Sequence, residues 1–426
     1  MTLYRWIEVR LLQRLPDSTR RSQLVGSLVR GLSAAISGVF LAYFLSALAQ
    51  ILIVRQLGKL LYGEYATLAA TLGLVASLLG FGLDIWLLNE GGRAPADLGR
   101  NIAHVLRIKL LGAAILLVLV GIGWANQIVQ TPAFIIGVIG VICDSLTNTG
   151  YNALRALRRN GQVAIFQVIA PLVLLLALLV MRYTAISVFA LFCVQAATSG
   201  ALALVLLWRL SNLCGTLTGH RFDLGYLVRG AWLFVVSDVL SNLYTQSSVA
   251  ILGRLVDPAA VGLFKPALNI IGFTFLVPSL IFLVGLPHLN AAGLERQQYR
   301  GLVRAMSIGA ALYGLVVLIG LWFFADLIIR ILFGADYAAS MPLVKVMSLV
   351  PLFKAGSFVC VAILLSLNQL RLRVGIQAVI TMMSLAGGLL LIPVYGLSGA
   401  VWLYTATEAL IFVLYLCGAA LALRRA

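Results

Sequence analysis

Charged residues are scarce in this chain of 426 residues, and only 11% are Asp, Glu, Lys or Arg. A typical soluble domain contains about 25%. The hydrophobic class accounts for 62% of the chain. A water-soluble fold needs more polar surface than this composition supplies, so a soluble enzyme or a soluble DNA-binding protein is excluded.

The usual ligands of metals and cofactors are also scarce. The five cysteines are odd in number and never spaced CxxC, so neither a disulfide framework nor a zinc site is indicated. No two of the three histidines lie at metal-ligand spacing. The chain has no GxxxxGK[ST] motif, so ATP is not its direct energy source. We expect neither a metal nor a cofactor.

Long apolar runs dominate the sequence instead. A membrane-spanning helix needs about 20 mostly apolar residues, and the runs are continuous rather than alternating, which excludes a β-barrel. The fold class that we predict is an all-α polytopic membrane protein of about twelve transmembrane helices. The expected spans are 31–54, 65–88, 109–125, 132–154, 162–181, 185–210, 230–252, 260–286, 305–328, 341–367, 374–395 and 397–421.

The net charge of +17 follows the predicted topology. Most of the 31 lysines and arginines fall in the loops and helix ends on one side of the membrane, the side of both termini. The positive-inside rule places that side in the cytoplasm of a plasma-membrane protein, so no nucleic-acid partner is indicated. Residues 1–30 are rich in arginine and lack the pattern of a cleavable signal. We expect them to form a cytoplasmic amphipathic segment.

The two halves of the chain repeat one another. Arg55 and Gly63 correspond to Arg254 and Gly262 at a common offset of 199 residues. Six spans in each half give both halves the same orientation. We therefore predict an N-lobe at residues 31–222 and a C-lobe at residues 223–426. This arrangement is typical of a duplicated transporter with its substrate site between the halves.

One segment of the N-lobe also carries a family pattern. Gln50 and Arg55 are followed by Leu57-Gly58, by Tyr62-Gly63-Glu64-Tyr65 and by Gly80-Phe-Gly-Leu-Asp84-Ile-Trp-Leu-Leu88. The pattern resembles bacterial polysaccharide flippases of the multidrug/oligosaccharidyl-lipid/polysaccharide exporter superfamily. The resemblance implies two pseudo-symmetric six-helix lobes in a V shape around a central cavity that opens alternately to each side.

The resemblance also implies a function. Its members move polyprenyl-pyrophosphate-linked oligosaccharides outward across the plasma membrane, so the expected partners are the lipid-linked oligosaccharide, membrane lipids, and a glycan polymerase or glycosyltransferases. We expect a monomer. Family members often have fourteen helices, and roles of an additional helix pair do not transfer to this chain.

Two polar stripes indicate where a cavity could lie. Asp144 is followed on one helical face by Thr147, Asn148 and Tyr151, and Asp238 by Ser241, Asn242, Thr245 and Ser248. The stripes either line a water-filled cavity or pack against other helices through hydrogen bonds. On the first interpretation, Asn148 and Asn242 bind substrate.

Basic residues inside the spans are candidates for binding an anionic head group. Lys354 either pairs with Glu408 or faces the cavity as a substrate-binding cation. Four further cations would form a basic collar near the outer mouth: Arg55, Arg254, Lys265 and Lys345. Charge-assisted hydrogen bonds from such residues replace the water around a pyrophosphate. The alternative is that they extend to the membrane interface as ordinary snorkelling side chains.

Acidic residues inside the spans are candidates for ion coupling. Asp144, Asp238 and Glu408 outnumber Lys354, and desolvation makes a buried carboxylate easier to protonate. We expect these three residues to couple transport to H⁺ or Na⁺. Asp84 is expected to hold the inner gate by pairing with Arg93 or Arg107.

Two other functions compete with the flippase. A cation-coupled small-molecule or drug antiporter of the same superfamily would also suit the central acids. A polyprenol-dependent glycosyltransferase or ligase fits less well, because such enzymes usually place acidic or histidine side chains on large external loops, and no predicted external segment is long.

Overall fold

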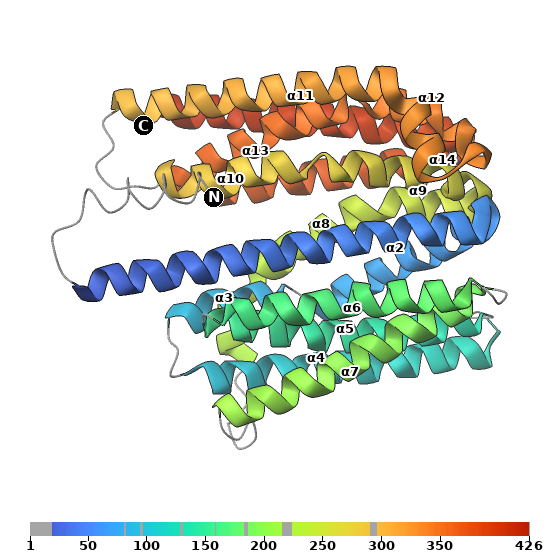
Figure 1. Ribbon diagram of the computed structural model, residues 1–426, viewed down its shortest axis with the longest axis horizontal. Coiled ribbons are helices and arrows are strands. Elements are labelled where there is room, and N and C mark those ends of the chain that lie inside the picture. The colour runs from blue at the N-terminus through green and yellow to red at the C-terminus, as the bar shows by residue number, and fades with distance from the viewer. Residues whose placement is uncertain are drawn as a thin grey trace.

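The computed structural model describes residues 19–80, 82–93, 97–127, 131–157, 159–182, 186–214, 224–289 and 296–425, and within these ranges the regular elements are helices (Figure 1). The N-lobe contains α2 (Thr19–Gly80), α3 (Leu83–Arg93), α4 (Leu98–Ala125), α5 (Pro132–Ala156), α6 (Asn160–Met181) and α7 (Val188–Cys214). The C-lobe contains α8 (Leu224–Leu255), α9 (Pro258–Phe273), α10 (Leu276–Leu289), α11 (Arg296–Leu332), η2 (Ala335–Ser340), α12 (Met341–Met347), α13 (Val350–Ser366) and α14 (Leu370–Arg425).

Two of these helices each contain two membrane crossings. Helices α2 and α14 are broken by Gly58 (φ 68°) and Gly396 (φ 57°), and positive φ is readily adopted only by glycine. The two arms of α14 pack antiparallel, since a Cβ on Gly418 would lie 3.3 Å from the Ile376 side chain. Eight helices of the described residues, or nine with one bent pair, are long and apolar enough to cross a membrane.

The prediction of twelve crossings is confirmed when these pieces are assembled. The breaks in α2 and α14 add two crossings, and the polar helix α8 adds another. Helices α9 and α10 together make one crossing, as do α12 and α13. The start of α2 and the end of α14 lie at one end of the bundle, called here the terminal end. The breaks within α2 and α14 lie at the other end, called the turn end (Figure 1).

Some predicted boundaries differ from the structure. The expected loop between residues 54 and 65 is a single break at Gly58, because one glycine is enough to redirect the chain. Helix α2 begins at Thr19 and runs unbroken through the expected boundary at residue 30. Residues 1–18, and the lobe boundary at residue 222, lie outside the described residues.

A reciprocal glycine contact shows the pseudo-two-fold relation between the lobes. A Cβ on Gly63 would lie 1.8 Å from the Pro258 carbonyl oxygen, and a Cβ on Gly262 would lie 1.9 Å from the Lys59 carbonyl oxygen. The repeat offset of 199 residues that relates Gly63 to Gly262 also relates Lys59 to Pro258. Each half therefore presents the same surface to the other, as a two-fold axis requires.

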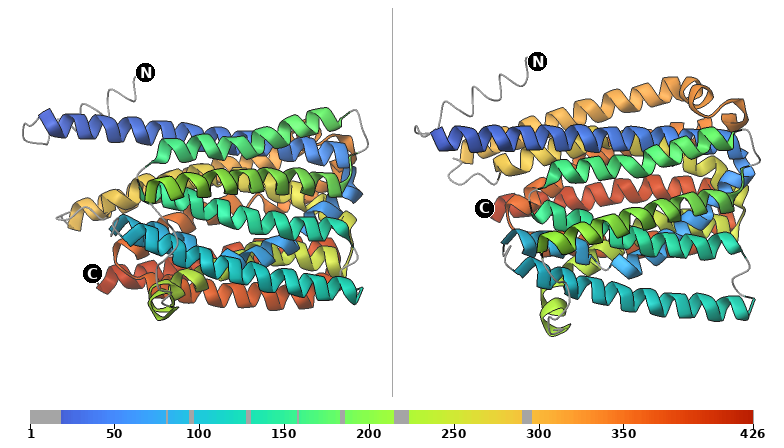
Figure 2. Two further views of the ribbon diagram at one scale, coloured as in Figure 1. Left: turned by 90° about the horizontal axis from the view of Figure 1, so that it is seen from below. Right: turned by 60° about the horizontal axis from the view of Figure 1, so that its bottom comes forward.

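The apolar core is shared by the lobes at only one end. One buried cluster joins residues of both lobes near the turn end, including Val54, Tyr62, Phe264 and Tyr337. Near the terminal end a second cluster lies in the N-lobe together with the first turns of α8, and a third lies in the C-lobe. The lobes are thus fused at the turn end and packed mostly as separate bodies at the terminal end, with α2, α8 and α9 between them (Figures 1 and 2).

Candidate functional site

A buried ion pair lies inside the N-lobe. The Lys109 ammonium, whose side chain is 2% exposed, is 2.7 Å from one Asp84 oxygen and 2.8 Å from the other, and it donates to the Ser145 carbonyl at 2.9 Å. The Thr149 hydroxyl also donates to Asp84, at 2.8 Å. Asp84 thus has Lys109 as an ion-pair partner, which the sequence did not suggest; the side chain of Arg93, one of the two predicted partners, lies outside the described residues. Sequence reasoning counted Lys109 as the first residue of a span, but α4 begins eleven positions earlier at Leu98.

Asp238 connects this region to the C-lobe. Its carboxylate accepts the backbone N–H of Gly82, at the break between α2 and α3. Gly82 has φ +58°, and a Cβ there would lie 2.2 Å from the Phe234 carbonyl oxygen. An aspartate of α8 thus satisfies a free amide at the start of α3, in the manner of an N-cap.

Two further carboxylates lie within electrostatic range of the Asp84–Lys109 ion pair, at the contact between the lobes. Lys109 interacts electrostatically with Asp84, Asp144 and Asp238. Together these four groups carry a net negative charge when all of them are ionised. Of the residues expected to couple ions, Asp144 and Asp238 each interact electrostatically with Lys109 and Asp84.

The predicted stripe on α5 divides into two parts. The Thr147 hydroxyl donates to the Ser199 carbonyl of α7 at 3.0 Å, and the Tyr151 hydroxyl donates to the Phe166 carbonyl of α6 at 3.3 Å. These two residues pack against neighbouring helices. Asp144 and Asn148 are exposed and lie 3.5 Å apart, so they remain available to a cavity.

The stripe on α8 faces helix α14. Ser241 and Thr245 are exposed, and Ser241 accepts the Gln377 amide at 2.8 Å. Asn242 donates to the Asp238 carbonyl one turn earlier on its own helix, and Ser248 is buried.

Lys354 and Glu408 form a second buried ion pair, within the C-lobe. The Lys354 ammonium lies 2.8 Å from Oε1 of Glu408, and the Glu408 side chain is almost fully buried. The ammonium also lies over the ring of Phe275, 5.3 Å from its centroid. The pairing that the sequence left open is present, but Lys354 keeps 22% of its side chain exposed, so it faces a cavity as well.

That cavity has a volume of about 250 Å³ and lies between α8, α10, α13 and α14. Its polar lining consists mainly of Lys354, Arg373, Ser241, Thr245, Gln377 and Thr381. Nε of Arg373 and Oε1 of Gln377 are buried without a hydrogen-bond partner among the described residues. Two cations and unpaired polar atoms suit an anionic group bearing several oxygens.

Arg373 was not predicted as a site residue, because the sequence pattern placed it in a cytoplasmic loop. Helix α14 begins three residues earlier, so Arg373 belongs to the span. The alternation of Arg371 and Arg373 with apolar residues was the available signal, since only one of the two side chains can face the interior.

The residues of the predicted collar have different surroundings. Arg55 donates to the carbonyls of Ile331 and Leu332, the latter at 2.8 Å, at the carboxyl end of α11. This is the usual position for a basic residue that caps a helix, and it joins the lobes at the turn end. Arg254 is exposed, while Lys265 and Lys345 are half-buried and form no ion pair within the described ranges.

These features define a class of protein: a multi-pass α-helical membrane protein with two related six-helix lobes and ionised groups inside its spans. The fold matches that of an inward-facing multidrug resistance MATE family transporter of the MOP superfamily, with a TM-score of 0.74 at 13% identity over 92% of this chain and 98% of the other. It also matches the lipid II flippase MurJ in an inward closed conformation, with a TM-score of 0.72 at 12% identity over 90% and 87%. An outward-facing MATE transporter matches with a TM-score of 0.63 at 14% identity over 93% and 95%.

A match to a family model identifies the family of this chain. Residues 52–342 match the model of the family described as "Polysaccharide biosynthesis protein", and the chain belongs to that family. No functionally curated protein matches the chain. The predicted two-lobed V-shaped fold, and the predicted membership of the superfamily that contains the polysaccharide flippases, are both confirmed.

Proposed function

We propose that this protein is a flippase that moves a polyprenyl-pyrophosphate-linked oligosaccharide from the inner to the outer leaflet of the plasma membrane by alternating access. The observation that carries the proposal is the C-lobe cavity lined by Lys354 and Arg373, inside a chain of the polysaccharide biosynthesis family. The cavity offers an anionic head group two cations within the spans, where desolvation is otherwise costly.

The positions of the three buried apolar clusters support alternating access. The lobes share an apolar cluster only near the turn end, so rocking about this contact would open or close the terminal end. The structure of this chain matches the inward-facing MATE transporter, with a TM-score of 0.74, better than the outward-facing one, with a TM-score of 0.63. This difference supports an inward-facing state for the structure described here. We infer that the terminal end is cytoplasmic, as the distribution of basic residues predicts.

The cluster of Asp84, Lys109, Asp144 and Asp238 is our candidate for coupling to H⁺ or Na⁺. Asp238 joins it to the contact between the lobes, because its carboxylate accepts the Gly82 amide. Neutralising that carboxylate weakens the hydrogen bond and so favours separation of the lobes at this point. Glu408 is engaged by Lys354, and we give it the secondary role of holding that cation in place.

We assign the other predicted substrate-binding residues from their positions in the structure. Asn148 beside Asp144, and Asn242 beside Asp238, would contact the sugar. Lys265 and Lys345 would contact the pyrophosphate as it leaves, while Arg254 is open to solvent or lipid head groups and Arg55 holds α11. A glycan polymerase or glycosyltransferases would be the functional partners.

The acidic cluster favours a second function, a cation-coupled small-molecule antiporter. Its excess of carboxylates would also suit a cationic drug, and the fold is shared by MATE transporters.

Reconstitution into proteoliposomes tests the choice. A fluorescent lipid-linked oligosaccharide should become accessible to an external lectin at a rate that rises with an imposed cation gradient. Arg373→Gln should slow this step about tenfold or more, since a hydrogen bond to a charged group contributes about 1.5–3 kcal/mol. Arg371→Gln, which changes an exposed arginine two residues away, is the matched control. Transport of a cationic dye without any flipping of the lipid would establish the antiporter instead.

A further inference from the structure

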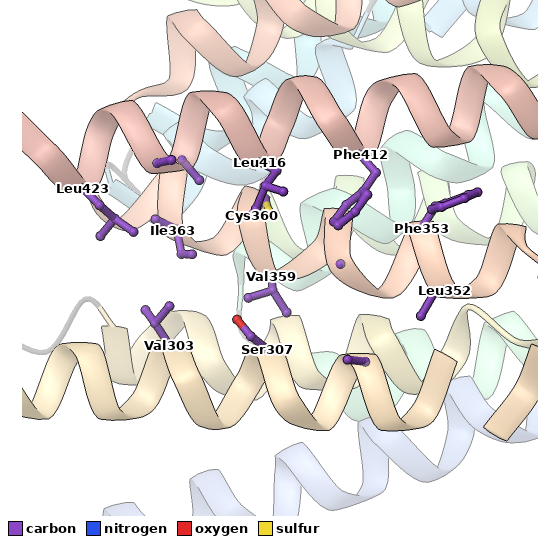
Figure 3. Close-up of a pocket in the computed structure, with 14 residues that line it drawn as sticks. Val303, Ser307, Leu352, Phe353, Val359, Cys360, Ile363, Phe412, Leu416 and Leu423 are labelled. Atoms are coloured by element: carbon purple, nitrogen blue, oxygen red, sulfur yellow. The ribbon is translucent and has the colours of Figure 1, made fainter. Parts of the chain in front are cut away.

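The polar cavity of the C-lobe is small. Its volume of about 250 Å³ is below that of a pocket that encloses a drug-sized ligand. An apolar groove of about 420 Å³, formed by α11, α13 and the second arm of α14, lies on the other side of α13, and Ser307 carries the only hydroxyl among its lining side chains (Figure 3). Polar recognition at α13 and α14 is therefore confined to the cavity, which has room for a phosphate and one sugar ring at most.

Two side chains that line the cavity each contain a buried atom with no hydrogen-bond partner among the described residues. The atoms are Nε of Arg373 and Oε1 of Gln377. They do not bond to each other, although the two residues lie one turn apart on α14, about 6 Å along the helix. An arginine Nε can only donate and an amide oxygen can only accept. Because a buried atom without a partner loses its hydration uncompensated, a ligand that supplies both an acceptor and a donor is favoured.

Helix α8 holds the amide of Gln377 in place. Its Nε2 donates to the Ser241 hydroxyl oxygen at 2.8 Å and lies 3.5 Å from the Ser237 carbonyl oxygen. Since the nitrogen and the oxygen belong to one planar group, these contacts fix the direction in which Oε1 points. The acceptor is thus oriented before a ligand arrives, and such preorganisation lowers the cost of binding.

The two atoms require different groups on the ligand. Arg373 requires an acceptor, and a phosphate oxygen supplies one through a charge-assisted hydrogen bond, with Lys354 as a second cation. Gln377 requires a donor, and an ionised pyrophosphate that is esterified at both ends has none. The donor therefore belongs to the sugar next to the phosphate. There the ring carbon beside the linkage, C2, carries a hydroxyl or an acetamido N–H.

We propose that Gln377 determines specificity for the cargo by accepting a hydrogen bond from the C2 substituent of its first sugar, while Arg373 and Lys354 hold the adjoining phosphate. The inference rests on the proposed function. A first sugar with a hydroxyl or an acetamido group at C2 satisfies Oε1, whereas a 2-deoxy sugar leaves it without a partner. A site built around a substrate donor rejects an analogue that lacks the donor more strongly than an apolar pocket rejects a missing methylene.

Two cargoes that differ by one hydroxyl test the specificity. Polyprenyl-pyrophosphate-linked glucose and its 2-deoxyglucose analogue are each incorporated into proteoliposomes with the full-length protein. Periodate added outside cleaves the C3–C4 diol that both sugars share, so its consumption reports arrival of the sugar in the outer leaflet. The wild type should flip subsaturating glucose cargo about tenfold faster than the 2-deoxy cargo, equivalent to 1.4 kcal/mol.

Three variants separate recognition from packing. Gln377→Leu removes the acceptor at similar volume and should flip the two cargoes at the same rate. Thr381→Val is the matched control, because Thr381 lines the same cavity and donates to the Leu240 carbonyl of α8 at 3.3 Å. It loses a contact between α14 and α8 but keeps the acceptor, so the tenfold preference should remain. Arg373→Gln should slow both cargoes and also keep the preference.

The outcomes distinguish the specificity from the function. Equal rates of the wild type with both cargoes would overturn the role of Gln377 and leave the flippase intact. A preference that survives Gln377→Leu, or that is lost in Thr381→Val, would overturn that role as well. Failure of the wild type to flip either cargo would refute the flippase itself. Thermal unfolding in detergent verifies that each variant is folded, and the comparison of cargoes on the wild type stands without the variants.

Discussion

Replacing both members of the Lys354–Glu408 pair separates its structural role from its role in transport. Glu408 is almost fully buried, and its Oε2 has no hydrogen-bond partner among the described residues. Lys354→Met therefore leaves a buried carboxylate with no cation, which costs about 3–5 kcal/mol. Glu408→Leu should cost less, because the Lys354 side chain is 22% exposed and its ammonium can turn toward the cavity.

The double variant Lys354→Met/Glu408→Leu removes both charges and keeps similar volume. Such replacements of buried pairs are often neutral, or stabilising by about 1–4 kcal/mol. Thermal unfolding in detergent should therefore show a loss in the single lysine variant and recovery in the double variant.

Transport should not recover with stability. If Lys354 contacts the anionic head group, the double variant is stable but flips lipid-linked oligosaccharide much more slowly than wild type in proteoliposomes. A stable double variant with the wild-type flipping rate would show that Lys354 serves the fold alone, and the head-group site would lose its main cation.

Three more results are expected. Gly262→Leu should destabilise the protein by about 1–3 kcal/mol, because a Cβ there meets a backbone carbonyl at 1.9 Å. The same change at the uncrowded Gly309 should leave the thermal unfolding temperature nearly unaltered. Equal losses of stability in the two variants would contradict the glycine contact. Lys109→Ala should lower the free energy of unfolding by about 3–5 kcal/mol, because it leaves Asp84 without its cation. Adding Asp84→Leu should recover most of that loss in the same assay. An unstable double variant would argue against a simple ion pair. Asp238→Asn should make flipping independent of an imposed cation gradient while the protein remains folded, and retained gradient dependence would exclude Asp238 as the coupling residue.

The number of crossings could be predicted from the sequence because burial in lipid requires long apolar runs whatever the neighbours are. The internal repeat was also visible, through Gly63 and Gly262, since a close backbone contact tolerates no side chain. Helix ends were predicted less well. Lys109 was placed at the first residue of a span and Arg373 in a loop, because an isolated charge beside an apolar run is expected at its boundary. In the structure each lies within a helix and faces other polar groups.

The pairing of charges could not be predicted for a related reason. Asp84 had several basic residues nearby in the sequence, but its partner is on another helix, and the choice depends on how α3, α4 and α5 pack. The same holds for the stripe on α5, where helical periodicity places Thr147 and Asn148 close together on one side. Only the position of α7 shows that the first is buried and the second is accessible.

The sequence by itself determined that this is a duplicated, all-helical membrane protein with ionised groups inside its spans, because lipid imposes length, hydropathy and charge rules that act on each segment separately. The tertiary structure alone decided which charges meet, where the lobes touch and that a polar cavity and an apolar groove share two helices. Those features depend on contacts between segments distant in the chain, and no local rule specifies them.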